Sequence, residues 1–354
     1  MKYSPGRMTV SSVGGRSWCR MNKVVEKFPT RPLVADDLQR VIEIDSNHSG
    51  RRRDGFFRKR LDAALAEPHK FVYLGCEIGD VLQGFLLARL QEGEYGSEEP
   101  SASFDAIGVD PGLVTSGMGR ALLDALARIL QHKGIAAIHT QADWHNLPML
   151  QFFAGTGFSL APRHILERTA TPLHDEQYAD DLVEEAGRLG DANDYSDVTS
   201  DQPGAMARDL VACRSLRESD LPALVKIDRK ISGRNHADYY QQKLAEALGE
   251  SGVRVSLVAE QDDHVVGFVM ARVDFGEFDR IEPVAVLDSL AVHPDYAHHL
   301  VGTALLSQLL ANLSALQIEV VRSETDAEHA AVFGFLKRNG FIRSQRLPFV
   351  RSVS

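Results

Sequence analysis

The chain has 354 residues, of which 44% are hydrophobic and 25% charged, and its formal net charge at pH 7 is -10. This length predicts about two domains, and no run approaches the ~18 apolar residues that a membrane span needs. The negative charge disfavours nucleic-acid binding because a polyanion is repelled. Cys19, Cys76 and Cys213 form no Cys-x-x-Cys pair, so we expect neither a disulfide framework nor a zinc site. We therefore expect a cytoplasmic protein.

The first 28 residues are basic and rich in serine and glycine. They carry six lysines and arginines but one acid, Glu26. We expect a disordered basic tail over residues 1–28; the alternative, a targeting peptide, lacks the apolar core of a secretory signal.

The sequence then repeats itself with a shift of 183 residues. Residues 31–158 align without a gap to residues 214–341, and about 40 of these 128 pairs are identical. Identity is dense where Gly84–Arg89 matches Gly267–Arg272. A repeat this long indicates a duplicated domain, because each copy is large enough to bury its own core.

Within the first copy, strands and helices alternate. After a first short strand, the hydrophobic pattern predicts helices over residues 36–45 and 56–67, strands over 70–78, 82–91 and 103–109, a helix over 117–134, a strand over 135–142, a short helix over 147–157 and a last strand from Phe158. Such alternation predicts an α/β layered fold, with a mixed sheet flanked by helices in each copy.

An acidic segment separates the two copies. Residues 173–205 contain many Asp and Glu residues but one basic residue, Arg188, which favours a solvated linker over an interaction segment. We therefore expect an N-terminal domain over residues 29–170, a linker over 171–207 and a C-terminal domain over 208–354. The two domains are expected to pack as an internal pseudo-dimer.

A glycine turn follows the strand that ends at Val109. Gly117 and Gly119 stand at the start of a predicted helix, where free N–H groups and the helix dipole form an anion site that glycine leaves open. Gly-x-Gly alone also fits an ordinary helix start. Neither the Walker lysine nor the third glycine of a dinucleotide-binding fingerprint is present.

In combination, these motifs resemble the GCN5-related N-acetyltransferase (GNAT) superfamily. Val109 and Pro111 match the family's Val-x-Pro at the strand end, and Gly117-Met118-Gly119 matches its pyrophosphate turn. Downstream, Asn146, Phe153 and Gly157-Phe158 match the family's Asn, Tyr and Gly-Phe. The resemblance covers both copies and implies two tandem acyl-CoA N-acyltransferase domains that use acetyl-CoA as co-substrate and no metal.

The resemblance also implies a cofactor-binding set in the first copy. It comprises Ile107, Gly108, Val109, Val114, Thr115, Ser116, Gly117, Met118, Gly119, Arg120, Asn146 and Phe153. Val114 departs from the usual Gln or Arg of the family. The second copy departs further, because Leu300 replaces the first glycine and would crowd a diphosphate, so we expect acetyl-CoA mainly in the first copy. His298 and His299 either contact phosphate or are solvated turn residues.

A carboxylate four residues before the strand-ending valine is the base in many family members. That position holds Asp105 in the first copy and Asp288 in the second, which we take as catalytic candidates. Each acid could instead hydrogen-bond a neighbouring loop. Asp143 and Asp326 are secondary base candidates with a structural alternative.

The family's proton-donating tyrosine is replaced by Phe153 and by Leu336, neither of which can donate a proton. The thiolate then leaves unaided or takes its proton from water, or the chain is inactive. For the acceptor we expect contacts from Ser49, Arg51 and Asp143: Arg51 can hold a carboxylate, whereas Ser49 and its neighbour Gly50 can equally cap a helix.

The expected function is therefore acetyl transfer from acetyl-CoA to a primary amine, with no nucleic acid and no membrane as partner. The main alternative is a non-catalytic acyl-CoA-binding regulatory or scaffolding protein, which the two missing tyrosines keep open.

Overall fold

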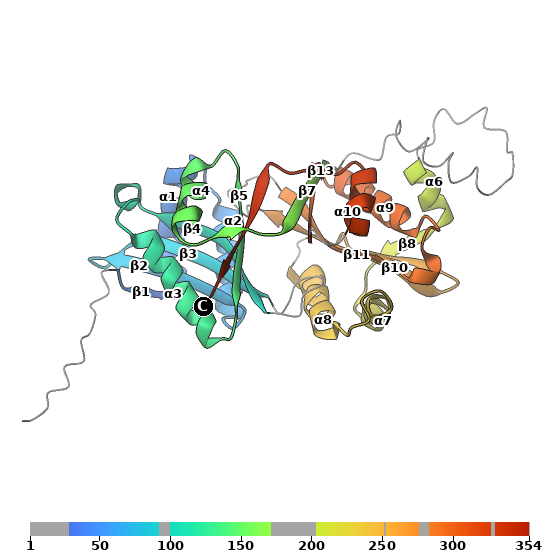
Figure 1. Cartoon of the computed structure of the whole chain (residues 1–354), viewed down its shortest axis with the longest axis horizontal. Helices are drawn as coiled ribbons and strands as arrows, with labels where there is room; N and C mark the ends of the chain where they lie inside the picture. Colours follow the sequence, from blue (N-terminus) through green and yellow to red (C-terminus); the bar gives the residue numbers. More distant parts are fainter. Residues whose placement is uncertain are drawn as a thin grey trace, which may run out of the picture.

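The computed structural model describes residues 28–91, 100–170, 203–250, 253–275, 283–326 and 330–353. These residues form two domains that lie side by side, each built on a seven-stranded mixed sheet with helices on both faces (Figure 1). The predicted fold class is thereby confirmed. Residues 1–27 of the predicted tail and 171–202 of the predicted linker lie outside the described residues.

The helices and strands predicted for the first copy are present. Its elements, with η for short helical turns, are β1 (Thr30–Pro32), η1 (Ala35–Asp37), α1 (Leu38–Ser49), α2 (Asp54–Ala66), β2 (Phe71–Ile78), β3 (Val81–Gln91), β4 (Ser101–Val109), η2 (Pro111–Leu113), α3 (Met118–His132), β5 (Ala137–Asp143), α4 (Leu147–Gly155), β6 (Ser159–Leu160) and β7 (Arg163–Thr169).

The second copy repeats this order behind one additional helix. Its elements are α6 (Pro203–Leu210), β8 (Ala212–Ser215), η3 (Glu218–Asp220), α7 (Leu221–Ser232), α8 (Ala237–Ala245), η4 (Glu246–Glu250), β9 (Leu257–Gln261), β10 (His264–Phe275), β11 (Pro283–Val292), η6 (Pro294–Tyr296), α9 (Val301–Ala315), β12 (Val320–Asp326), α10 (Ala330–Arg338), β13 (Ile342–Arg343) and β14 (Arg346–Ser352).

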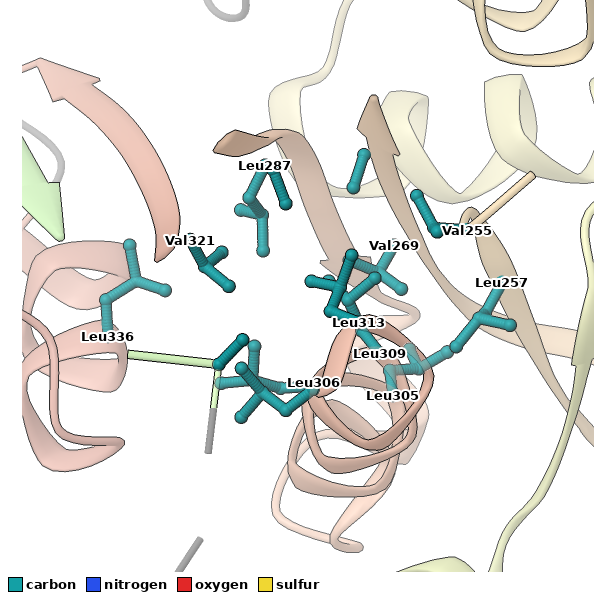
Figure 2. Close-up of a cluster of buried hydrophobic side chains, with 14 of the residues drawn as sticks. Val255, Leu257, Val269, Leu287, Leu305, Leu306, Leu309, Leu313, Val321 and Leu336 are labelled. Carbon is teal, nitrogen blue, oxygen red and sulfur yellow. The ribbon is translucent and has the colours of Figure 1, made fainter. Parts of the chain in front are cut away.

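Each sheet is covered on both faces by helices of its own copy. In the first domain, α3 and α4 pack on one face and α1 and α2 on the other, and each face has its own apolar cluster. In the second domain α9 places Leu305, Leu306, Leu309 and Leu313 against the sheet (Figure 2). These four leucines recur at helical spacing and are fully buried, which explains why this segment forms a helix that docks on a sheet.

The two domains exchange their last strands. The first sheet has the order β1-β2-β3-β4-β5-β14-β6, and the second has the order β13-β7-β12-β11-β10-β9-β8. In Figure 1 the red β14 accordingly lies in the first domain, whereas the green β7 lies in the second. A division of the chain into contiguous domains at residue 170 therefore does not describe the two folded units.

Both exchanged strands dock with equivalent contacts. β14 pairs antiparallel with β5 from Arg346 opposite Asp143 to Ser352 opposite Ala137, and β7 pairs in the same register with β12. Phe349 of β14 then inserts into the first core, with its ring centroid 5.1 Å from that of Phe153. The end of the chain thus completes a core that the beginning of the chain builds.

No helix within the described ranges combines the length and the apolar character needed to cross a bilayer.

The exchange predicts that a residue near the end of the chain stabilises the first domain. Phe349→Ala should lower the free energy of unfolding by about 3–5 kcal/mol, because it empties a buried aromatic position. The matched control is Ile342→Ala, at a side chain that is 71% exposed in β13, and it should stay within about 0.5 kcal/mol. Urea denaturation followed by circular dichroism measures both; equal small effects would contradict the docking of β14.

Candidate active site

The first site begins where two parallel strands diverge. β4 pairs with β5 only from Ser101 to Ser103, yet β4 continues to Val109 and β5 to Asp143. The hydroxyl of Thr140 donates to the Phe104 carbonyl at 2.9 Å, at the point of divergence. Beyond it, the edge of β4 toward β5 has no ladder partner among the described residues, which leaves room for an extended ligand along that edge.

Asp105 lies at a β-bulge in β4. The register between β3 and β4 shifts between Leu87 and Ala88, so that Asp105 has no direct partner across the ladder. Its side chain is 0% exposed, and the Arg89 guanidinium donates to it at 2.7 Å (Nε to Oδ2) and 3.0 Å (Nη2 to Oδ1). The predicted base is therefore held by a bidentate ion pair inside the protein.

The second copy reproduces the divergence, the bulge and the ion pair. β11 pairs with β12 only from Val284 to Leu287, and the register with β10 shifts beside Asp288. Arg272 binds the Asp288 carboxylate, and the Lys243 ammonium lies 4.0 Å from it. Asp288 differs from Asp105 in being 15% exposed at its side chain.

The glycine turn of the first copy has the geometry of an open anion site. Gly117 adopts φ 93° and immediately precedes α3, and a Cβ built on it would meet nothing closer than Phe28 at 4.0 Å. Gly119 is needed for packing, because a Cβ there would lie 3.2 Å from the Phe152 ring. Thr115 and Arg120 are exposed, and the first N–H groups of α3 have no acceptor within the helix.

Two further residues of the predicted cofactor-binding set, Val114 and Ser116, lie in or beside this turn. Val114 is 56% exposed, and the Ser116 hydroxyl accepts from the Met118 N–H at 3.3 Å. Met118 itself is fully buried and anchors the start of α3 in the core.

The corresponding turn of the second copy has a leucine where the first copy has Gly117. His298 and Leu300 both adopt positive φ, 66° and 59°, which is costly for residues other than glycine. Leu300 immediately precedes α9, as Gly117 precedes α3. The branched side chain therefore stands where the first copy has none. His298 and His299 are exposed turn residues.

Asn146 and Phe153, predicted to contact the cofactor, take structural positions. The Asn146 side chain accepts from the Met149 N–H at 3.2 Å and caps α4. Phe153 is 1% exposed and packs against the rings of Phe104 and Phe158. Their contact with a cofactor stays a prediction.

Asp143 lies at the open end of β5 and is 41% exposed at its side chain. Burial by itself raises the pKa of this carboxyl, but hydrogen bonds from the His145 N–H at 2.9 Å and ring at 3.0 Å, with the charge of Arg346, outweigh it and hold the pKa below its ordinary value. Asp143 is thus an ionised carboxylate that solvent reaches.

Ser49 and Arg51 form the exposed turn between α1 and α2. The Ser49 hydroxyl donates to the Arg51 carbonyl at 2.8 Å, and Gly50 ends α1 in the left-handed conformation. This is the local turn that the sequence offered as one of two interpretations. A contact of Arg51 with an acceptor stays a prediction.

Two residues that contact β4, Arg89 and His48, were not predicted from the sequence. Arg89 was visible as the last residue of the repeated Gly84–Arg89 block, but its pairing with Asp105 across two strands leaves no local pattern. His48, near the end of α1, contacts the carbonyl of Val109 through Nε2. A histidine near the end of a helix carries no signal for such a contact.

A cavity of about 150 Å³ lies between the two domains and was also not predicted. Its walls come from β3, β4 and β5 of the first domain, from β10, β11, β12, α8 and α10 of the second, and from Arg163 of the exchanged β7. Across the described ranges, no group of three or more His, Cys, Asp or Glu side chains is arranged to hold a metal ion.

Comparison with known proteins identifies the fold. The model of the acetyltransferase (GNAT) family matches residues 38–158 and 216–341. A GCN5-related N-acetyltransferase of Sphaerobacter thermophilus superposes with a TM-score of 0.57 and 14% identity, covering 93% of this chain and 96% of that one. A tandem GNAT protein from the clavulanic acid biosynthesis pathway gives 0.58 and 14%, covering 93% and 99%. Among curated protein sequences, no significant match is found.

The two family matches fall one in each copy and together span more than half of the chain. The diverging strands, the bulge and the turn before the third helix occur in both matched regions. The chain therefore belongs to the acetyltransferase (GNAT) family, as a tandem protein with two domains of this fold.

Proposed function

We propose that the chain transfers an acetyl group from acetyl-CoA to a primary amine and that it binds acetyl-CoA mainly in the first domain. One observation carries the domain assignment. Gly117 and Leu300 occupy the same left-handed position before α3 and α9, but only the glycine brings no side chain to that position. A diphosphate needs that position open to reach the N–H groups of the first helical turn.

In this proposal the predicted cofactor-binding set divides into two parts. Within Ile107, Gly108 and Val109, alternate residues direct their backbone groups to the edge of β4 that β5 leaves, and the turn from Thr115 to Arg120 binds the diphosphate. The acyl-CoA supplies the activated acetyl thioester. The chain holds it along the strand edge and keeps the phosphates at a helix terminus, where the dipole favours negative charge.

Two carboxylates compete for the role of base. Asp105 sits beside the diverging strands, but its side chain is buried and already accepts two bonds from Arg89. Asp143 is exposed, so an amine reaches it directly from solvent. We propose Asp105 as the base of the first domain and Asp288 as its counterpart, with Ser49, Arg51 and Asp143 contacting the acceptor.

A second candidate function is acyl-CoA binding without turnover. It is favoured by the complete burial of the Asp105 side chain and by the apolar environment of Phe153, which provides no proton donor for the thiolate. Release of free thiol from acetyl-CoA in the presence of amines distinguishes the two functions, since a binding protein releases none.

The proposed domain assignment predicts one acetyl-CoA per chain. Calorimetric titration should give a stoichiometry near one, and Gly117→Leu should weaken binding about tenfold or more by filling the turn. The reciprocal Leu300→Gly should leave this site unchanged and stabilise the fold by about 1 kcal/mol, because a left-handed leucine is replaced. Two equal sites, or binding lost only through changes of the second turn, would reverse the assignment.

The proposed base predicts a loss of turnover without a loss of cofactor affinity. Asp105→Asn should lower kcat by about 10²–10⁴, as expected when a general base is removed, while the Kd of acetyl-CoA stays the same. Asp288→Asn is the matched variant and measures the share of the second domain. Thermal unfolding of each variant checks that breaking the ion pair with arginine has not unfolded the chain. Full turnover of Asp105→Asn with a large loss in Asp143→Asn would move the base to Asp143.

If Phe153 serves only in packing, its replacement should change the stability of the fold and leave turnover unaffected. Phe153→Leu should lower the free energy of unfolding by about 1–2 kcal/mol, because contacts with Phe104, Phe158 and Phe349 weaken. Turnover should remain within a few-fold, since no proton donor is removed. A loss of several orders of magnitude in a folded variant would show that this ring acts at the thioester.

A further inference from the structure

The open edge of β4 ends at a backbone carbonyl that already has a hydrogen-bond donor. The Asp110 N–H donates to the Gln83 carbonyl of β3 at 2.7 Å. In a planar trans peptide the C=O and N–H groups point in opposite directions, so the Val109 carbonyl points away from β3, to the edge that β5 has left. Nε2 of His48 contacts this carbonyl. Because a carbonyl only accepts, the imidazole carries its hydrogen on Nε2 and donates it here.

Helix α1 places His48 over this edge through two earlier contacts. Arg40, Ile44 and His48 are four residues apart and therefore lie on one face of the helix. Arg40 binds the Asp110 carboxylate at 2.8 Å, and a Cβ built on Gly108 would lie 3.1 Å from Cγ2 of Ile44. His48 follows in the last turn of α1 and is exposed, so its ring can rotate away from the carbonyl without unpacking the core.

The second copy keeps the carbonyl but not the donor. The His293 N–H donates to the Val266 carbonyl at 2.8 Å, so the carbonyl of Val292 also points to an open strand edge. The position of His48 is held there by Ile231, a 48% exposed side chain without a donor. The second domain forms the same helix, strand and turn without a histidine at this place. The contact of His48 is therefore not a requirement of the fold.

This contact lies in the path of the ligand proposed for the first domain. The pantetheine arm of CoA carries amide groups, and an extended amide chain along a strand edge donates its N–H groups to the carbonyls of that edge. The imidazole of His48 already occupies the last of these carbonyls. A ligand that uses the Val109 carbonyl must first displace the imidazole, and the free energy of the lost bond reduces its apparent affinity.

We infer that His48 is a latch on the acyl-CoA groove of the first domain: its imidazole holds the Val109 carbonyl in the free protein and leaves it when the pantetheine arm binds. The inference rests on the proposed function, because it places acyl-CoA along this strand edge. It assigns to His48 a role in setting the affinity for acyl-CoA, separate from the diphosphate turn and from the carboxylates proposed as base.

The test separates the pantetheine arm from the nucleotide. Calorimetry on the full chain compares acetyl-CoA with adenosine 3′,5′-bisphosphate, which lacks the arm. His48→Ile introduces the residue that the second copy has at this position and removes the donor. It should bind acetyl-CoA about three- to tenfold more tightly, as expected when one hydrogen bond no longer has to be broken, and should bind the bisphosphate as the unchanged protein does. The matched control is Asn47→Ile, at the exposed neighbouring residue, which should leave both affinities unchanged.

The position of the ring is measured independently by ¹⁵N NMR of the histidine side chains. The signal that disappears in His48→Ile should report a hydrogen on Nε2 in the free protein, and it should change on saturation with acetyl-CoA but not with the bisphosphate. Thermal unfolding checks that both variants are folded.

The possible results distinguish the latch from the function on which it rests. Equal acetyl-CoA affinity of His48→Ile and the unchanged protein would overturn the latch, since the arm would then use the second lone pair of the carbonyl or none. Weaker binding would also overturn it and make the imidazole a ligand contact. An equal gain for the bisphosphate would place the effect outside the strand edge. Absence of acetyl-CoA binding in every variant would instead contradict the proposed function itself.

Discussion

The exchange of β7 and β14 is the constraint on which the rest of the structure depends. Each sheet needs a strand from the other half of the chain, so the two domains share their cores rather than merely touching. The exchange also brings Arg163 into the cavity and places Arg346, whose Nε donates to Gln141 at 3.0 Å, beside the first-domain wall. A cavity with walls from both domains keeps its shape only because the strands hold those walls in register.

The sequence predicted the duplicated fold but could not predict the exchange. β7 and β14 are equivalent segments of the repeat, and Arg163 opposite Asp326 makes the same pair as Arg346 opposite Asp143. Two strands with equivalent places in the repeat carry no local signal of which sheet each one joins. The same limit applies to Arg89 and Asp105: both residues were visible in the repeat, but their pairing depends on a register shift that only the folded sheet shows.

The two copies differ at two places around the opening between their diverging strands: the turn before the helix and the walls near the bulge. In the first copy the turn is open at Gly117, and the walls near the bulge are apolar at Phe56, Ala106 and Ala142. In the second, Leu300 stands at the turn position of Gly117, and the same three wall positions carry the hydroxyls of Tyr239, Ser289 and Thr325. One scaffold has thus been adjusted by a few side chains, while the strands and helices that position them have stayed the same.

The docking of β14 also determines when the first domain can form during synthesis. Residues 346–352 emerge from the ribosome well after β5, the strand they pair with, which ends at Asp143. Until those residues emerge, β5 has an unpaired edge and the ring of Phe349 is missing from the core. The first domain therefore stays incomplete, with an exposed strand edge, during the translation of about two hundred further residues.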